Sequence, residues 1–335
     1  MFKKLFCIVL IISLCASVMS FASCKKEDEP VRLEIATTTA DLLGTEGYMT
    51  DEEAIRGLYE AGFKYIDLSM YTTLTPDSLY MQEDWRTAVL ELKEVADELG
   101  MKFVQAHSPN GNPLNSAELE DLLAKTIRSI EICGVLGIEN IIVHAGWQDG
   151  LTKDQWFEAN KAFYNKLLPT AEKCGVNILC ENSTSSNMGF MYYIYTGADM
   201  REFIEYVDHP NFHGCWDTGH ANVEMDDQYE DIVALGDEMY AIHYVDNMGK
   251  ADTHLMPYFG TMNPEPIMKA LQAINYKGYF TLECTGEKRA KGVWLGPEIP
   301  ALEDVDLRSM TRIEEERMLY DIAEYILNTY DMLAK

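Results

Sequence analysis

A single-domain (β/α)8 barrel, the TIM barrel fold, is the architecture that the sequence predicts, and three observations point to it. From Val31 onward, short apolar runs alternate with amphipathic helical stretches, which is the pattern of a parallel sheet covered by helices. Eight such runs fall within about 300 residues, a typical length for a closed barrel. No glycine-rich phosphate loop follows the first run, and this disfavours the alternative, an open doubly wound sheet.

The predicted strands are short apolar or β-branched runs, each followed by a polar loop. They cover residues 32–38, 64–70, 102–108, 140–146, 176–182, 212–218, 239–245 and 279–285. Because the parallel strands of a barrel run in one direction, their carboxyl ends meet at one mouth, where barrel enzymes carry their active sites.

Helices are predicted between these strands from apolar residues at positions i, i+3 and i+4. The clearest cover residues 51–63, 85–100, 117–137 and 161–175, with Gly62, Gly100, Gly137 and Gly175 as candidate C-caps. Residues 286–312, which include Pro297 and Pro300, are predicted to form a long loop at the mouth. A last helix is predicted from Ile313 to Leu333.

The first residues are predicted to direct export rather than to join the barrel. Residues 1–23 carry lysines at positions 3 and 4, continue as an apolar run and end in small residues before Cys24, as secretory signals do. The ending FASC resembles the lipobox of bacterial lipoproteins, which implies a lipid on Cys24, a tether over residues 24–30 and the barrel over 31–335. Such a chain would be anchored at the outer membrane, in the periplasm or at the cell surface. An ordinary cleaved signal or a membrane anchor is the alternative.

The composition argues against several classes of protein. The formal net charge of −28 repels phosphate backbones, so no nucleic-acid partner is expected. Five cysteines follow Cys24, an odd number without any CxxC pair, and they lie inside predicted helices and strands. We therefore expect buried thiols rather than a disulfide framework or a thiolate zinc site.

Carboxylates and imidazoles stand where the predicted strands end. They are His107, His144, Glu181, Asp217, His243 and Glu283, with His220 just past Asp217, and Asp252 and His254 in the loop after the seventh strand. In a barrel these side chains would converge on one mouth. Buried groups of this kind are costly unless they are paired or bind metal. Their oxygen and nitrogen atoms suit one divalent ion, either Mn²⁺, Co²⁺, Zn²⁺ or Mg²⁺.

The segment WDTGH, residues 216–220, is the most specific motif in the sequence. Together with the strand-end residues it resembles the xylose-isomerase-like TIM barrel superfamily, which includes sugar phosphate isomerases and epimerases, ketose 3-epimerases, inosose dehydratases and endonuclease IV. The resemblance covers the chain from Val31 to the last helix. It implies that Glu181, Asp217, His243 and Glu283 hold the metal and that His220 binds the substrate or a second metal.

A fuller match to the endonuclease pattern is also present. His107, His144, His220, Asp252 and His254 fall where that phosphate-ester enzyme places further zinc ligands. Many sugar-acting relatives keep some of these residues, so the match leaves the number of metal ions open. The acidic composition, the export signal and the lack of Lys/Arg clusters argue against a nuclease.

The leading hypothesis is a metal-dependent isomerase or epimerase of a sugar or sugar derivative. The metal would hold two adjacent substrate oxygens and stabilise an enediolate, while Glu181 and Glu283 exchange the proton of one carbon. His144 and His220 would hydrogen-bond sugar hydroxyls, and Trp147 would cover the apolar face of the ring or pack as a loop aromatic. The remaining predicted substrate contacts are His107, Asp252 and His254.

Two alternatives stay open. A lyase or dehydratase of the same fold, acting on keto-sugars or 3-keto-glycosides, would use the same metal and base. A non-catalytic sugar-binding lipoprotein would be favoured by a broken set of metal ligands, and all four positions are intact. The oligomeric state is not indicated by the sequence.

Overall fold

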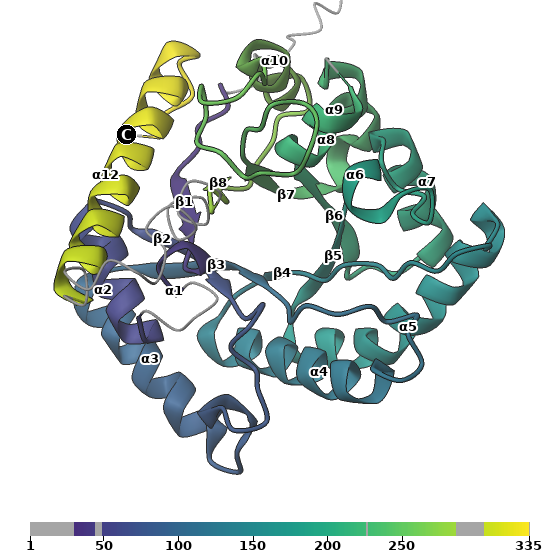
Figure 1. Cartoon of the computed structure of the whole chain (residues 1–335), viewed down its shortest axis with the longest axis horizontal. Coiled ribbons are helices and arrows are strands. Elements are labelled where there is room, and N and C mark those ends of the chain that lie inside the picture. Colours follow the sequence, from purple (N-terminus) through teal and green to yellow (C-terminus); the bar gives the residue numbers. More distant parts are fainter. Residues whose placement is uncertain (1–29, 44–48, 226, 286–304, 335) are drawn as a thin grey trace, which may run out of the picture.

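The computed structural model describes residues 30–43, 49–225, 227–285 and 305–334. Eight parallel strands pair in chain order, and β8 pairs back with β1 to close the barrel. Figure 1 looks down this barrel and shows the strands as an inner ring with the long helices outside it. The predicted (β/α)8 fold is confirmed. The predicted signal peptide and Cys24 lie outside the described residues.

Each observed strand lies inside its predicted range. The strands are β1 Ile35–Thr38, β2 Tyr65–Ser69, β3 Lys102–His107, β4 Asn140–Ile142, β5 Asn177–Glu181, β6 Phe212–Asp217, β7 Met239–Tyr244 and β8 Phe280–Leu282. Most of their residues are fully buried because helices cover the outside and side chains fill the inside.

At least one α-helix follows every strand, and two α-helices follow β1, β5 and β6. They are α1 Ala40–Leu43, α2 Asp51–Ala61, α3 Trp85–Leu99, α4 Leu119–Leu136, α5 Lys153–Cys174, α6 Ser185–Met188, α7 Gly197–Val207, α8 Thr218–Glu224, α9 Tyr229–Leu235, α10 Pro264–Ala273 and α12 Val305–Thr329. Gly62 and Gly100 end α2 and α3 in the left-handed conformation, at φ of 109° and 68°, as the C-cap prediction requires. Among the described helices, none has the length and apolar composition needed to cross a membrane.

The last helix differs from its prediction at both ends. α12 runs from Val305 to Thr329, instead of from Ile313 to Leu333. It starts earlier because no glycine or proline follows Pro300 to interrupt it. It ends earlier because Asp331 turns the chain at φ 52°, which lets Leu333 form a parallel bridge with Leu33. Of the predicted loop over 286–312, residues 286–304 lie outside the described part of the chain and the rest is helical.

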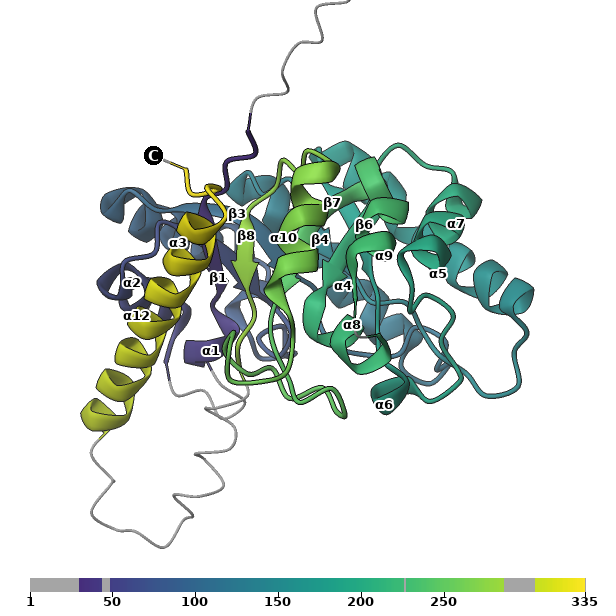
Figure 2. The same cartoon turned by 90° about the horizontal axis from the view of Figure 1, so that it is seen from above.

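The carboxyl ends of the strands define the mouth. The short helices α1, α6 and α8, which follow β1, β5 and β6, all lie on the lower side of the barrel in Figure 2. The carboxyl terminus of the chain lies on the opposite side. Side chains at the strand ends therefore share the side of α1, α6 and α8, as predicted.

An apolar cluster fills the inside of the barrel under one half of the mouth. It consists of Ile142, Leu179, Cys215 and Ala241, from β4 to β7. Each lies two positions before a predicted site residue, and residues at i and i+2 of a strand face the same side. Of the five cysteines beyond Cys24, four are buried as expected, whereas Cys174 is only partly buried.

Under the other half of the mouth the barrel interior is polar. Asp67 on β2, Gln105 on β3 and Thr281 on β8 are all buried, and we call these three residues the polar floor. Gln105 Nε2 donates a hydrogen bond of 2.9 Å to Asp67 Oδ2, and Thr281 Oγ1 donates one of 3.4 Å to Gln105 Oε1. The site thus rests on apolar packing on one side and on a hydrogen-bonded layer on the other.

Candidate metal centre and active site

Four side chains from four neighbouring strands converge at the mouth, and we call them the quartet. Glu181 ends β5, Asp217 ends β6, His243 lies one residue before the end of β7, and Glu283 directly follows β8. One ligand atom from each lies within 4.8 Å of the others. His243 Nδ1 is 2.6 Å from Glu181 Oε1 and 3.1 Å from Glu283 Oε2. The structure thus brings together the four residues predicted to hold the metal.

The central part of the WDTGH segment forms a tight turn between β6 and α8. Asp217 closes β6 and caps α8, because its Oδ1 accepts a hydrogen bond of 2.5 Å from the backbone N of His220. Its own backbone N donates to Asn182 Oδ1 at 2.7 Å. Gly219 is required by a close approach, since a Cβ there would lie 2.8 Å from Val245 Cγ1. The turn holds Asp217 rigidly and leaves its second oxygen, Oδ2, free of the cap.

The donor set of the quartet fits a divalent cation. Asp217 Oδ2 is buried and has no hydrogen-bond partner within the described residues. Three carboxylates and one imidazole meet here, and no lysine or arginine of the described chain forms an ion pair with them. Such an excess of buried negative charge is unfavourable unless a cation compensates it. The oxygen-rich set suits Mn²⁺ or Mg²⁺ best and also accepts Co²⁺ or Zn²⁺.

The charges of the quartet depend on one another. Burial alone would raise the pKa of Glu181, but the charge of His243 and its hydrogen bond lower it to about 2. The pKa of Glu283 is lowered as well, because the same two effects of His243 outweigh burial. Burial raises the pKa of Asp217 to about 7, with the charge of His220 opposing it and those of Glu181 and Glu283 adding to it. At neutral pH the metal-free protein therefore keeps Asp217 partly protonated.

Metal affinity should increase as the pH rises through about 7, the pKa of Asp217. A cation binds the carboxylate form, so below this pKa binding must release a proton from Asp217, and above it this contribution disappears. His243 releases a further proton on both sides of this pH, because burial opposes its protonation but Glu283 and Glu181 outweigh burial and raise its pKa well above the ordinary value. Calorimetric titration with Co²⁺ in two buffers of different ionisation enthalpy would measure both the affinity and the protons released. An affinity that stays constant from about pH 6 to pH 8, with no proton release, would contradict this assignment of Asp217 as a ligand.

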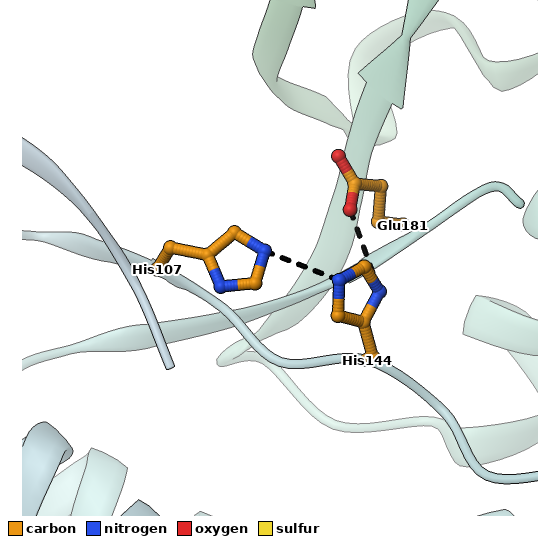
Figure 3. Close-up of side chains that lie close together, drawn as sticks. All are labelled: His107, His144 and Glu181. Carbon is orange, nitrogen blue, oxygen red and sulfur yellow. Dashed lines mark hydrogen bonds and ion pairs between the residues drawn. The ribbon is translucent and has the colours of Figure 1, made fainter. Parts of the chain in front are cut away.

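A second group, shown in Figure 3, joins two histidines to the quartet. His107 Nε2 lies 3.1 Å from His144 Nε2, and His144 Nδ1 lies 3.4 Å from Glu181 Oε2. His107 ends β3 as predicted, whereas His144 lies two residues beyond the end of β4 at Ile142. Burial lowers the pKa of His144 to about 4, so its ring is neutral at pH 7. A neutral ring has one donor and one acceptor nitrogen, which suits contact with a hydroxyl group.

A third group forms on the other side of the quartet. Asp252 Oδ2 lies 3.3 Å from His220 Nε2, and Asp252 Oδ1 lies 2.9 Å from His254 Nε2. His254 has a left-handed backbone at φ 49°, and its Nδ1 lies 2.9 Å from the carbonyl oxygen of Glu283. Burial opposes protonation of His254, but Asp252 outweighs it and raises its pKa to about 10. The second and third groups both have donor sets that accept a further cation as well as a polar substrate.

Trp147, predicted as a substrate contact, occupies a packed loop. It follows His144 by three residues, is partly buried and packs against the main hydrophobic core. Its backbone N donates to Asn112 Oδ1 at 3.1 Å, and its carbonyl oxygen accepts from Asn112 Nδ2 at 2.8 Å. These contacts support the packing interpretation, and a contact with a sugar stays a prediction.

Two residues next to the quartet were missed by the sequence analysis. Asp67 Oδ2 and Gln105 Nε2 lie 3.1 Å and 2.9 Å from His243 Nε2, the ring nitrogen that faces away from the other quartet members. One signal for Asp67 was present, because an acid interrupts the otherwise mostly apolar strand YIDLS. The contact itself joins residues 176 positions apart and depends on barrel closure.

Fold and site together define a (β/α)8 barrel protein with a carboxylate–histidine centre at its mouth. The family match agrees with this class: the model of the xylose isomerase-like TIM barrel family covers residues 55–307. The chain belongs to that family.

Several similar proteins carry names of sugar epimerases. An L-ribulose 3-epimerase from Methylomonas sp. is 24% identical over 274 residues, which are 76% of this chain and 85% of the relative. The structure of a D-psicose 3-epimerase from Clostridium cellulolyticum, with D-tagatose, matches 88% of this chain and 99% of its own at a TM-score of 0.66 and 19% identity. A 3-keto-D-glucoside 4-epimerase from E. coli matches 85% of this chain and 100% of its own at a TM-score of 0.60 and 19% identity. At these identities the structural matches establish the fold.

Proposed function

We propose that this protein is a divalent-metal-dependent isomerase or epimerase that moves a proton beside a carbonyl of a sugar or sugar derivative. One observation carries the proposal: two ionised carboxylates, Glu181 and Glu283, lie 2.6 Å and 3.1 Å from His243 Nδ1 in a donor set that fits a cation. The similarity to an L-ribulose 3-epimerase supports a carbohydrate substrate.

The mechanism assigns the proton transfer to the two glutamates. A bound divalent cation would supply Lewis-acid stabilisation of negative charge that develops on the substrate oxygens. One glutamate takes the proton from a carbon next to the carbonyl, and the other, after it has taken up a proton from solvent, delivers that proton to the same carbon. Their lowered pKa values keep both carboxylates ionised in the free protein, so that either can act first as the base.

The histidines beside the quartet orient the sugar. His144 is neutral, so it can donate to or accept from a hydroxyl group. His220 is protonated, because Asp217 and Asp252 raise its pKa above its ordinary value although burial opposes this, and its ring nitrogens donate. His107, Asp252 and His254 complete the polar lining of the mouth.

A lyase is the second candidate. The structural similarity to a 3-keto-D-glucoside 4-epimerase favours keto-sugars among the substrates to be tested. Abstraction of the same proton, followed by loss of a β-substituent, would give elimination instead of epimerisation. The neutral ring of His144, 3.4 Å from Glu181, is the candidate base for this reaction.

The products distinguish these reactions. The purified protein with Mn²⁺ would be incubated with a panel of ketoses, aldoses and 3-keto-glycosides. The products would then be separated, and their molecular masses measured by mass spectrometry. Epimerisation or isomerisation gives a product of unchanged mass, and this is the expected result. Elimination gives an unsaturated sugar or a free aglycone. Binding without conversion of any sugar would favour the non-catalytic lipoprotein and overturn the proposed activity.

The proposed location is outside the cytoplasm, at a membrane, through a lipid on Cys24. The support is the lipobox-like FASC and the charged tether that follows it. Cys24→Ser removes the acylated sulfur and should release the protein from the membrane fraction, because one lipid-bearing cysteine anchors a chain without spanning the bilayer. Fractionation with immunoblotting measures this. Unmodified wild-type chain found soluble in the cytoplasm would contradict the assignment.

A further inference from the structure

Asp67 is an unusual residue for the inside of a barrel. It lies in the middle of β2, where it is 0% exposed. Its Oδ2 lies 3.1 Å from His243 Nε2 and accepts a hydrogen bond of 2.9 Å from Gln105 Nε2. Its Oδ1 is buried and has no hydrogen-bond partner within the described residues.

Burial of the Asp67 carboxylate is energetically costly, so its presence in the barrel needs an explanation. No lysine or arginine of the described chain forms an ion pair with Asp67, and its ion-pair partner among the described residues is His243. A buried carboxylate without a cationic partner is strongly unfavourable, and a polar residue of similar size would fill the same space. The rest of the polar floor, Gln105 and Thr281, is uncharged. The Asp67 carboxylate therefore interacts chiefly with His243.

The imidazole of His243 separates Asp67 from the quartet. Its Nδ1 faces Glu181 and Glu283, at 2.6 Å and 3.1 Å, while its Nε2 faces Asp67. Asp67 thus contacts the ring at the nitrogen that does not face Glu181 and Glu283, so the imidazole links it to the candidate metal centre.

We propose that Asp67 is a positioning residue that prepares His243 to bind a divalent cation. Its carboxylate accepts the Nε2–H hydrogen, which selects the tautomer whose Nδ1 lone pair points into the quartet. Gln105 Nε2 lies 2.9 Å from both Asp67 Oδ2 and His243 Nε2; it donates to the carboxylate oxygen and holds it beside the ring. This inference rests on the metal centre of the proposed function, and it adds a residue from β2, a strand that contributes no ligand to the quartet.

Metal affinity, measured without any sugar, tests the inference. Asp67→Asn keeps the shape of the side chain and removes its charge, and the Co²⁺ affinity of this variant would be measured by competition with a chelator. We expect it to fall about 10- to 100-fold, the usual effect of removing a carboxylate that supports a metal-bound histidine. The matched control is Asp51→Asn, because Asp51 is a partly buried carboxylate on α2 that accepts a hydrogen bond of 2.7 Å from Tyr80 Oη, and its Co²⁺ affinity should not change.

A double-mutant cycle separates positioning from a general structural effect. In a His243→Gln background, Asp67→Asn should weaken Co²⁺ binding no further, because the route through the imidazole is already lost. If Asp67→Asn weakens binding equally in both backgrounds, Asp67 acts by some other route and the inference is wrong. Gln105→Met is the second variant, in case Asp67→Asn does not fold; it removes the amide that holds the carboxylate and should also lower Co²⁺ affinity.

The outcomes distinguish this inference from the proposed function. Co²⁺ affinity that is unchanged in both Asp67→Asn and Gln105→Met overturns the inference alone, even if the wild-type protein converts sugars. Weakened affinity in a protein that converts no sugar supports the inference and overturns the proposed activity. A wild-type protein that binds no Co²⁺ overturns both.

Discussion

Glu283→Gln is expected to lower kcat by at least about 100-fold, the low end for loss of a positioned acid or base. Glutamine keeps the shape of the side chain but cannot take up a proton, and it is a weaker metal ligand. Glu283 is suited to this role because its Oε2 is 3.1 Å from His243 Nδ1 and its pKa is lowered, so that it is ionised at neutral pH. Steady-state kinetics with the metal at saturation would measure the effect, and sugar binding should largely survive.

His220→Ala is the matched comparison for Glu283→Gln. His220 is assigned to substrate binding, so its loss should raise KM more than it lowers kcat. If Glu283→Gln keeps near-normal turnover, the mechanism with two carboxylates is wrong. A lyase that uses the neutral ring of His144 as its base would then be the better account.

Removal of the metal is expected to abolish turnover and to lower the melting temperature. Without a cation the quartet leaves three buried carboxylates close to one imidazole, and Asp217 Oδ2 has no hydrogen-bond partner among the described residues. A ligand present at about 1,000 times its Kd stabilises the folded state by about 4 kcal/mol, so the shift should be easily seen by calorimetry. Dialysis against EDTA should abolish turnover and lower the melting temperature, and addition of Mn²⁺ should restore both.

The control for metal removal is Asp217→Asn, which lacks one carboxylate ligand. Its melting temperature should respond much less to Mn²⁺ than that of the wild-type protein. Full activity in EDTA, together with metal analysis that finds no divalent ion in the purified protein, would refute the metal centre.

The barrel was predictable because its signals are local. Each strand is a short apolar run, and glycines such as Gly62 and Gly100 stand where left-handed C-caps end helices. The end of α12 was less predictable because it depends on a contact at a distance. Its end is set by the bridge between Leu33 and Leu333, which joins the two ends of the barrel domain.

The quartet was predictable for a different reason. Its members follow strands, and the closure of the barrel carries every strand end to one mouth. For side chains one layer deeper in the barrel, no such rule predicts which residues meet. Asp67 and Gln105 lie inside their strands, and nothing in the sequence says which of the other strands their side chains reach. Trp147, for which the sequence left a sugar contact and packing in the loop both open, packs against the core, and a sugar contact stays a prediction.

Incorporation of deuterium from D₂O tests the central claim most directly. The wild-type protein with its metal would convert an accepted sugar in D₂O, and mass spectrometry with NMR would locate the label. Two glutamates that exchange protons with solvent predict one deuterium in the product, at the carbon next to the carbonyl, with Glu283→Gln greatly slowing its appearance. Conversion of the sugar without deuterium at that carbon would contradict proton transfer by Glu181 and Glu283.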